Sequence, residues 1–249
     1  MKGIPCMSEL HLKTLQLDSH FRTLPEVSHA WGVLPRERFS CLSHAVSAAF
    51  AAVGLALLLV VAQGDAMLTL LATIYGVSAV LMFSASALYH ANKRKDDEIS
   101  LWRRLDHSAI FVMIAGTFTP ICFIHLNPTW FYSIVGAQWI LVAVGIFFKL
   151  AWLRAPRWLT TGIYLAMGWM AVIAVVPFVE SMSRFELSLL AAGGLSYSTG
   201  AVVYGLKKPD FWPNLVGFHG LFHLFVMGGA LSHFWLIYRS VAAAKIALG

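Results

Sequence analysis

The sequence carries very few charged residues for its length. Asp, Glu, Lys and Arg make up 12% of the 249 residues, whereas soluble domains carry about 25%. So few charges cannot cover a water-facing surface, which excludes an ordinary soluble domain. The apolar segments also lack the alternation of polar and apolar residues that a transmembrane β-barrel requires. The composition therefore predicts an all-α integral membrane protein.

Cysteine is scarce as well. Cys6, Cys41 and Cys122 are an odd number without close spacing, which argues against a disulfide framework or a thiolate metal site. Residues 1–40 lack the apolar core of 7–15 residues that a signal peptide contains near its start. We interpret them as a cytoplasmic tail.

Seven segments are long and apolar enough to cross a bilayer, which takes about 20 residues each. We predict one seven-helix transmembrane domain over 41–239, after the tail at 1–40 and before a short C-terminal tail at 240–249. Pro120 and Pro177 are predicted to kink the third and fifth helices. The seven predicted spans are 41–62, 67–91, 104–124, 131–150, 159–179, 185–206 and 217–239.

The basic residues predict the direction of these helices. Of the 18 Lys and Arg residues, all but Arg184, Arg239 and Lys245 fall in the tail or in loops on the same side of the membrane. Cytoplasmic loops are the ones enriched in Lys and Arg, so the N-terminus is predicted in the cytoplasm and the C-terminus outside. The net charge of +6 does not indicate nucleic-acid binding, because the basic residues are not gathered on a soluble module.

Ionisable and hydroxyl groups inside a span are costly and need a reason. Four short groups of them fall at one predicted depth, one to two turns inside the cytoplasmic interface. They belong to the first, second, third and seventh helices, so chance placement over both leaflets is disfavoured. These groups are Ser43 with His44, Ser86 with His90, Asp106 with His107, and His219 with His223.

The spacing of the histidines indicates a metal site. His219 and His223 are four residues apart and share one helix face, so both imidazoles can hold one ion, with His90 as a third ligand. Three neutral imidazoles with an open fourth position are a common catalytic Zn²⁺ arrangement. The alternative is a hydrogen-bonded histidine pair without metal.

Asp106 and Ser86 are the predicted catalytic residues. Asp106 would either deprotonate a water at the metal or orient a metal ligand, and Ser86 would hydrogen-bond the same water or a substrate oxygen. Asp106 could instead pair with Arg103 or Arg104.

The sequence resembles the progestin and adipoQ receptor family, in its bacterial hemolysin III-type branch. The resemblance extends from about Arg36 to Tyr238. The matching stretches are Glu37-x-x-Ser-x-x-Ser-His44, Ser86-x-x-x-His90, Arg104 to Pro120 with Asp106 inside it, Tyr164-Leu-Ala-Met-Gly-Trp169, and His219-x-x-x-His223 followed by His233-Phe-Trp.

The resemblance implies Zn²⁺ bound by His90, His219 and His223, with Asp106 and Ser86 close to the zinc. It also implies kinship with ceramidase-type membrane hydrolases and, for the bacterial branch, a role in membrane lipid homeostasis at the inner membrane. The residues further predicted around the ligands are Glu37, Ser43 and His44. Ser40 departs from the family pattern, which usually has an amide residue there.

Three functions follow as hypotheses. The leading one is a zinc-dependent hydrolase that cleaves an amide or ester bond of a membrane lipid. The second is a non-catalytic sensor or receptor-like protein in which zinc ties helices together, and the third is a pore-forming cytolysin. Membrane lipids are the expected partners, and the sequence leaves the oligomeric state open.

Overall fold

The computed structural model describes residues 33–95, 98–152, 156–213 and 215–248. Most of the predicted N-terminal tail lies outside this part of the chain. Within the described ranges every regular element is helical and no strand occurs. The elements are η1 (Pro35–Glu37), α2 (Arg38–Ala62), α3 (Ala66–Asn92), α4 (Leu101–His125), α5 (Pro128–Ala151), α6 (Arg157–Trp169), η2 (Met170–Ala174), α7 (Val175–Ser181), α8 (Arg184–Leu206) and α9 (Gly217–Leu248).

Seven helical stretches in this part of the chain are long and apolar enough to cross a membrane. Each overlaps one predicted span, which confirms the all-helical, seven-span prediction. The fifth stretch, Trp158–Ser181, combines α6, η2 and α7. The last helix, α9, continues to Leu248, so most of the predicted C-terminal tail at 240–249 is helical.

Local capping residues fix where several helices begin. The side chains of Asp65, Ser100 and Asn127 accept hydrogen bonds from backbone N–H groups in the first turns of α3, α4 and α5. Ser183 and Glu186 form a reciprocal capping box at the start of α8. These contacts satisfy N–H groups that have no partner inside the helix, so the short loops between spans define the helix starts.

The two prolines inside spans have different outcomes. Pro177 follows a break in the fifth span, where the chain changes from α6 into the 3-10 segment η2 and then into α7. A proline cannot donate to the carbonyl four residues before it, and for Pro177 that carbonyl belongs to Ile173 in η2. Pro120, by contrast, lies inside the uninterrupted helix α4.

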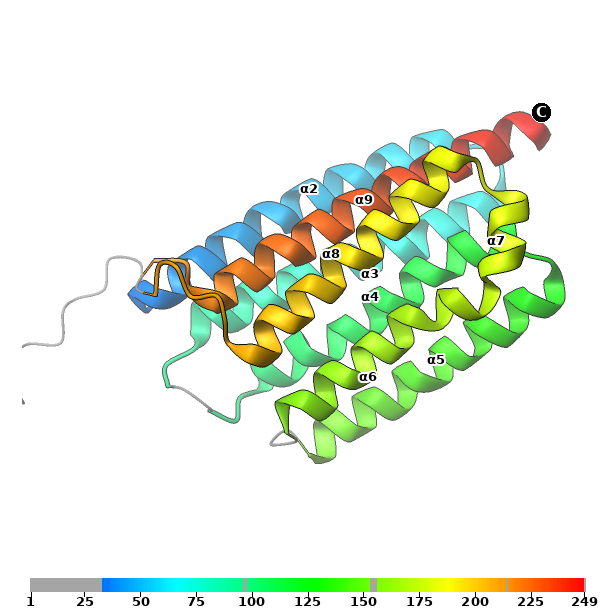
Figure 1. Ribbon diagram of the computed structural model, residues 1–249. Helices are drawn as coiled ribbons and strands as arrows, with labels where there is room; N and C mark the ends of the chain where they lie inside the picture. Colours follow the sequence, from blue (N-terminus) through cyan, green and yellow to red (C-terminus); the bar gives the residue numbers. More distant parts are fainter. Residues whose placement is uncertain (1–32, 96–97, 153–155, 214, 249) are drawn as a thin grey trace, which may run out of the picture. The chain divides into compact units, whose positions relative to one another are not determined.

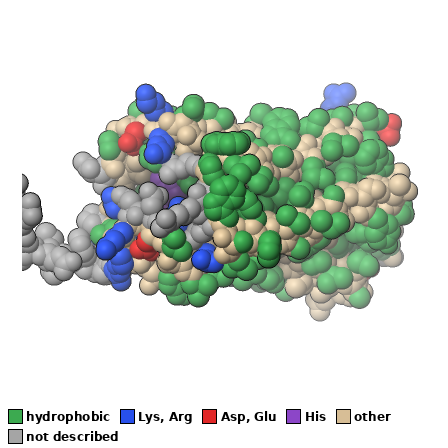
Figure 2. All heavy atoms as spheres, turned by 90° about the horizontal axis from the view of Figure 1, so that it is seen from below, with side chains coloured by type: hydrophobic (Ala, Val, Ile, Leu, Met, Phe, Trp, Pro, Cys, Tyr) green, Lys and Arg blue, Asp and Glu red, His purple; other side chains and the backbone are tan. Residues whose placement is uncertain are grey.

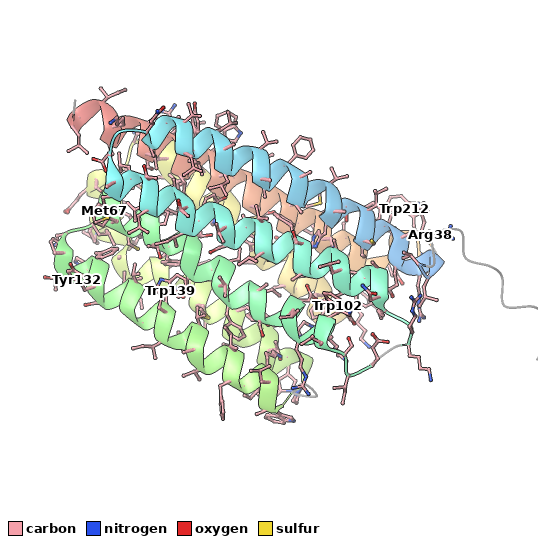
Figure 3. The ribbon with its side chains drawn as sticks, turned by 180° about the vertical axis from the view of Figure 1, so that it is seen from behind. Arg38, Met67, Trp102, Tyr132, Trp139 and Trp212 are labelled. Carbon is pink, nitrogen blue, oxygen red and sulfur yellow. The ribbon has the colours of Figure 1, made fainter. Side chains whose placement is uncertain are left out.

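Most helices pack against their neighbours in sequence, and α9 also packs against α2, which is distant from it in the chain. Helix α3 lies between α2 and α4, and α9 packs against both α8 and α2 (Figure 1). The starts of α2, α4 and α9 and the end of α3 therefore meet at one end of the bundle. Figure 3 shows Arg38, Trp102 and Trp212 toward this end, and Met67 and Tyr132 toward the opposite one.

Charged side chains lie near the two ends of the surface that Figure 2 shows, with a broad hydrophobic region between them. Large apolar side chains such as Phe50, Ile140 and Ile173 are more than half exposed in the structure. In a bilayer these side chains would contact acyl chains instead of water, which fits a multi-pass membrane protein.

Close helix contact at Gly229 yields the first prediction. A Cβ atom there would lie 2.7 Å from Cε2 of Tyr197 on the neighbouring helix α8, closer than side chains can approach. We expect Gly229→Ala to lower the free energy of unfolding by about 1–3 kcal/mol through overpacking. The measurement is the thermal unfolding midpoint of the purified protein in detergent.

The matched control is Gly194→Ala, because a Cβ atom at Gly194 meets no atom within 4 Å. We expect this variant to unfold at the wild-type midpoint. Equal midpoints for all three proteins would show that α8 and α9 are not in close contact at Gly229.

Candidate metal centre

Three histidines from two distant segments meet inside the end of the bundle where α2, α4 and α9 begin. His90 lies two residues before the end of α3, and His219 and His223 occupy the first two turns of α9. The Nε2 atom of His219 is 3.2 Å from Nε2 of His90 and 3.1 Å from Nε2 of His223. His90 and His223 are each 1% exposed, so the three nitrogens converge in a buried place.

The spacing of these nitrogens fits a tetrahedral metal ion. Ligand nitrogens about 2.0–2.1 Å from such an ion lie about 3.3 Å from one another. One potential ligand atom from each of His90, His219 and His223 lies within 4.8 Å of the others, and the described residues contain no second group of this kind. The structure thus brings together the three residues that the sequence analysis proposed as ligands, and their donor set suits zinc.

Glu37 holds the imidazole of His90 from its other side. This glutamate is the N-cap residue of α2 and is 5% exposed. Its Oε2 atom is 2.7 Å from Nδ1 of His90, and its Oε1 atom accepts a hydrogen bond from Nζ of Lys93, also at 2.7 Å. A carboxylate that accepts the Nδ1 proton leaves the Nε2 lone pair free for a metal.

Electrostatics keep the Glu37 carboxylate ionised. Burial alone would raise its pKa, but the hydrogen bonds from His90 and Lys93 outweigh burial and lower the pKa to about 2. The Glu37 carboxylate is therefore ionised near neutral pH and can accept hydrogen bonds from His90 and Lys93. The sequence analysis named Glu37 as a neighbour of the ligands but missed Lys93, although its position three residues after His90 puts it within one helical turn.

His44 covers one face of the site. Its ring is 2% exposed and stacks on the ring of His223, with centroids 3.7 Å apart and planes 19° from parallel. The ring of Phe83 also packs against the His44 ring, in a T-shaped arrangement. The hydroxyl of Ser43, the third residue predicted around the ligands, donates to the carbonyl of Ser40 within its own helix. Of these two neighbouring residues, it is therefore His44 that contacts the ligand His223.

The predicted catalytic pair, Asp106 and Ser86, also lies next to the histidines. Ser86 is 3% exposed and sits one turn before His90 on the same face of α3. Its hydroxyl donates a hydrogen bond to the Asp106 carboxylate at the start of α4, and Asp106 also interacts electrostatically with His90 and Arg103. A carboxylate and a hydroxyl thus lie near His90, one of the three ligands, and the predicted partner Arg103 is a neighbour of the same carboxylate.

Other buried histidines make contacts away from this cluster. His233 on α9 bonds to the carbonyl of Leu190 on α8. His125, at the far end of α4, has its Nε2 atom 2.8 Å from Oγ of Ser240. These contacts join neighbouring helices and bring no further histidine to the metal ligands.

Comparison with known proteins identifies relatives of most of the helical domain. Residues 33–234 match the family model described as Haemolysin-III related. Hemolysin-3 of Bacillus cereus is 34% identical over 200 residues, which cover 80% of this chain and 88% of that protein. The Hemolysin-3 homolog of Bacillus subtilis is 38% identical over 167 residues, 66% of this chain and 74% of the relative. The Adiponectin receptor protein of Drosophila melanogaster is 28% identical over 178 residues, 64% of this chain and 39% of the receptor.

The second prediction concerns metal binding by these side chains. We expect His219→Ala to abolish stoichiometric metal, because the remaining pair of imidazoles makes an incomplete site. We expect Glu37→Gln to weaken metal affinity by about 10–100-fold, because the amide is a poorer acceptor for the Nδ1 proton of His90. Elemental analysis of the purified protein, followed by titration with a chelator of known affinity, measures both effects.

The matched control is Glu180→Gln, which removes one carboxylate from an exposed position in α7. This variant should keep the wild-type affinity. Full metal retention in His219→Ala, or equal affinities for Glu37→Gln and wild type, would contradict the site as described.

Proposed function

The chain belongs to the haemolysin III-related family, and we propose that it is a membrane-embedded, zinc-dependent hydrolase that cleaves an amide or ester bond of a lipid. Such an activity would serve membrane lipid homeostasis. The observation that carries the proposal is the Asp106 carboxylate beside the histidine cluster, hydrogen-bonded to Ser86 and in electrostatic contact with His90. A carboxylate at this position is suited to accept a proton from a water near the metal ligands.

The metal that we propose for His90, His219 and His223 is Zn²⁺. Three imidazoles without a thiolate suit this ion, and in the described residues no cysteine belongs to the cluster. When bound, zinc would polarise a carbonyl group and make water a better nucleophile near neutral pH. Glu37 and His44 would hold the ligand rings of His90 and His223 in place.

Asp106 would move the proton during hydrolysis. Its carboxylate would accept a proton from the attacking water as the water oxygen forms a bond to the carbonyl carbon. The same proton would then pass to the leaving nitrogen or oxygen as the C–N or C–O bond breaks, which gives a carboxylic acid and an amine or alcohol. Ser86 would orient the Asp106 carboxylate through its hydrogen bond.

We further propose that the end of the bundle with the histidines faces the cytoplasm, in the inner membrane of a bacterium. The concentration of Lys and Arg near that end supports this orientation. A site one to two turns from the ends of the spans suits a lipid whose amide or ester carbonyl lies at the boundary between headgroups and acyl chains. The proposed substrates are therefore lipids of the cytoplasmic leaflet.

A structural role for the metal is the second candidate. Glu37 precedes α2, His90 is on α3, and His219 and His223 are on α9. A metal on these ligands would tie α3 to α9, and the hydrogen bond between Glu37 and His90 would join the start of α2 to the same site, as in a non-catalytic sensor. On this hypothesis metal removal lowers the thermal unfolding midpoint, and no lipid is turned over.

The third prediction separates the two candidates. Purified protein loaded with zinc is incubated with labelled ceramides and phospholipids, and the released fatty acid is measured for wild type and for Asp106→Asn. We expect the wild type to release fatty acid and Asp106→Asn to lose at least about 100-fold in rate, since the amide cannot accept the proton.

Zinc content is measured in the same samples, so that loss of the metal is not mistaken for loss of the proton acceptor. Absence of turnover by the zinc-loaded wild type with every lipid tested would favour the structural role. Equal rates for wild type and Asp106→Asn would exclude Asp106 as the acid–base group.

A further inference from the structure

An apolar groove lies on the outside of the same end of the bundle, where the chain between α8 and α9 packs against the start of α2. Its volume is about 170 Å³. Leu221 and Leu224, which alternate with His219 and His223 along α9, form one wall. The full lining is Phe39, Phe211, Trp212, Val216, Gly217, Leu221 and Leu224.

The groove adjoins a surface that is too apolar for water. Phe211 is 68% exposed, Trp212 61% and Leu215 68%. Tryptophan is enriched where the acyl chains of a bilayer meet the headgroups. Figure 3 shows Trp212 and Arg38 toward the same end of the bundle, where the spans begin or end. The groove thus lies at the height at which a lipid acyl chain joins its headgroup.

Cationic residues stand close in sequence to the apolar lining. Lys207 and Lys208 are exposed and lie at the start of the loop that carries Phe211 and Trp212, and Arg38 is exposed next to the lining residue Phe39. Asp210 is the acidic residue of this loop, and its Oδ1 atom would lie 3.6 Å from a Cβ atom at the lining residue Gly217. The three cationic residues outnumber it. Cations beside an apolar slot at headgroup height complement a ligand that has both a phosphate and an acyl chain.

We propose that this groove is a binding site for an anionic phospholipid of the adjoining leaflet. One acyl chain lies against Phe39, Trp212 and Leu224, and the headgroup phosphate lies among Lys207, Lys208 and Arg38. The charge beside the slot favours an anionic over a zwitterionic lipid. The site is separate from the metal ligands and does not depend on the proposed hydrolysis.

Binding there would act on the helix that carries two of the histidines. The lipid would contact Val216, which directly precedes α9, and Leu221 in the second turn of this helix, one on each side of His219 in the sequence. Occupancy of the groove should therefore stabilise the start of this helix. The expected sign is a rise in the thermal unfolding midpoint when anionic lipid is added.

The test uses full-length protein in detergent with phosphatidylglycerol or phosphatidylcholine, and native mass spectrometry counts the retained lipids. We expect wild type to retain phosphatidylglycerol in preference to phosphatidylcholine. Lys207→Gln should lower the affinity for phosphatidylglycerol about fivefold, the effect of one lysine near an anionic lipid. Trp212→Ala should lower retention of both lipids by removing one wall of the groove.

Each variant has a matched control away from the groove. Lys95→Gln removes one exposed lysine from the loop after α3, and Trp158→Ala removes an exposed tryptophan from α6. Both controls should retain lipid as wild type does, and phosphatidylglycerol should raise their unfolding midpoints as it does for wild type. The rise should be smaller for Lys207→Gln.

Three outcomes would overturn the proposal. Equal retention of the two lipids by wild type would remove the evidence for a phosphate site. An equal loss of phosphatidylglycerol affinity in Lys207→Gln and Lys95→Gln would mean that this charged end of the bundle attracts anionic lipid in general. Wild-type retention by both groove variants would show that the lipid binds elsewhere. If Trp212→Ala does not fold, the comparison of Lys207→Gln with Lys95→Gln decides alone.

Discussion

Burying imidazoles in an apolar helix bundle is costly unless their ring nitrogens find partners, and this constraint accounts for the arrangement around His90. The buried carboxylate of Glu37 is the partner of His90 on one side, with its ionised form held by Lys93. On the other side the Nε2 atoms of His90, His219 and His223 point toward one another. A metal ion satisfies all three at once, which hydrogen bonds between neutral rings cannot do.

Much of this site could be predicted from the sequence, because the relevant signals are local. The four-residue spacings of Ser86 with His90 and of His219 with His223 put each pair on one helix face. The number of spans followed from apolar length, and the family resemblance is confirmed by the match over residues 33–234. Asp106 was placed near the histidines by the predicted direction of its helix alone.

Other features depend on contacts between residues far apart in the chain. The bond between Glu37 and Lys93 joins residues separated by an entire hairpin of two spans, and no spacing rule reveals it. The stacking of His44 on His223 likewise requires the packing of α2 against α9. Hydropathy also does not reveal how far the last helix extends, since Ser240 and Lys245 are polar yet continue α9.

The central claim is that His90, His219 and His223 form a zinc centre. X-ray absorption at the zinc edge of the purified wild-type protein tests it most directly. The account predicts one zinc per chain with nitrogen or oxygen ligands at about 2.0–2.1 Å, and with the scattering pattern of three imidazoles. Sulfur ligands at about 2.3 Å, or a protein that retains no zinc when purified without chelators, would contradict it.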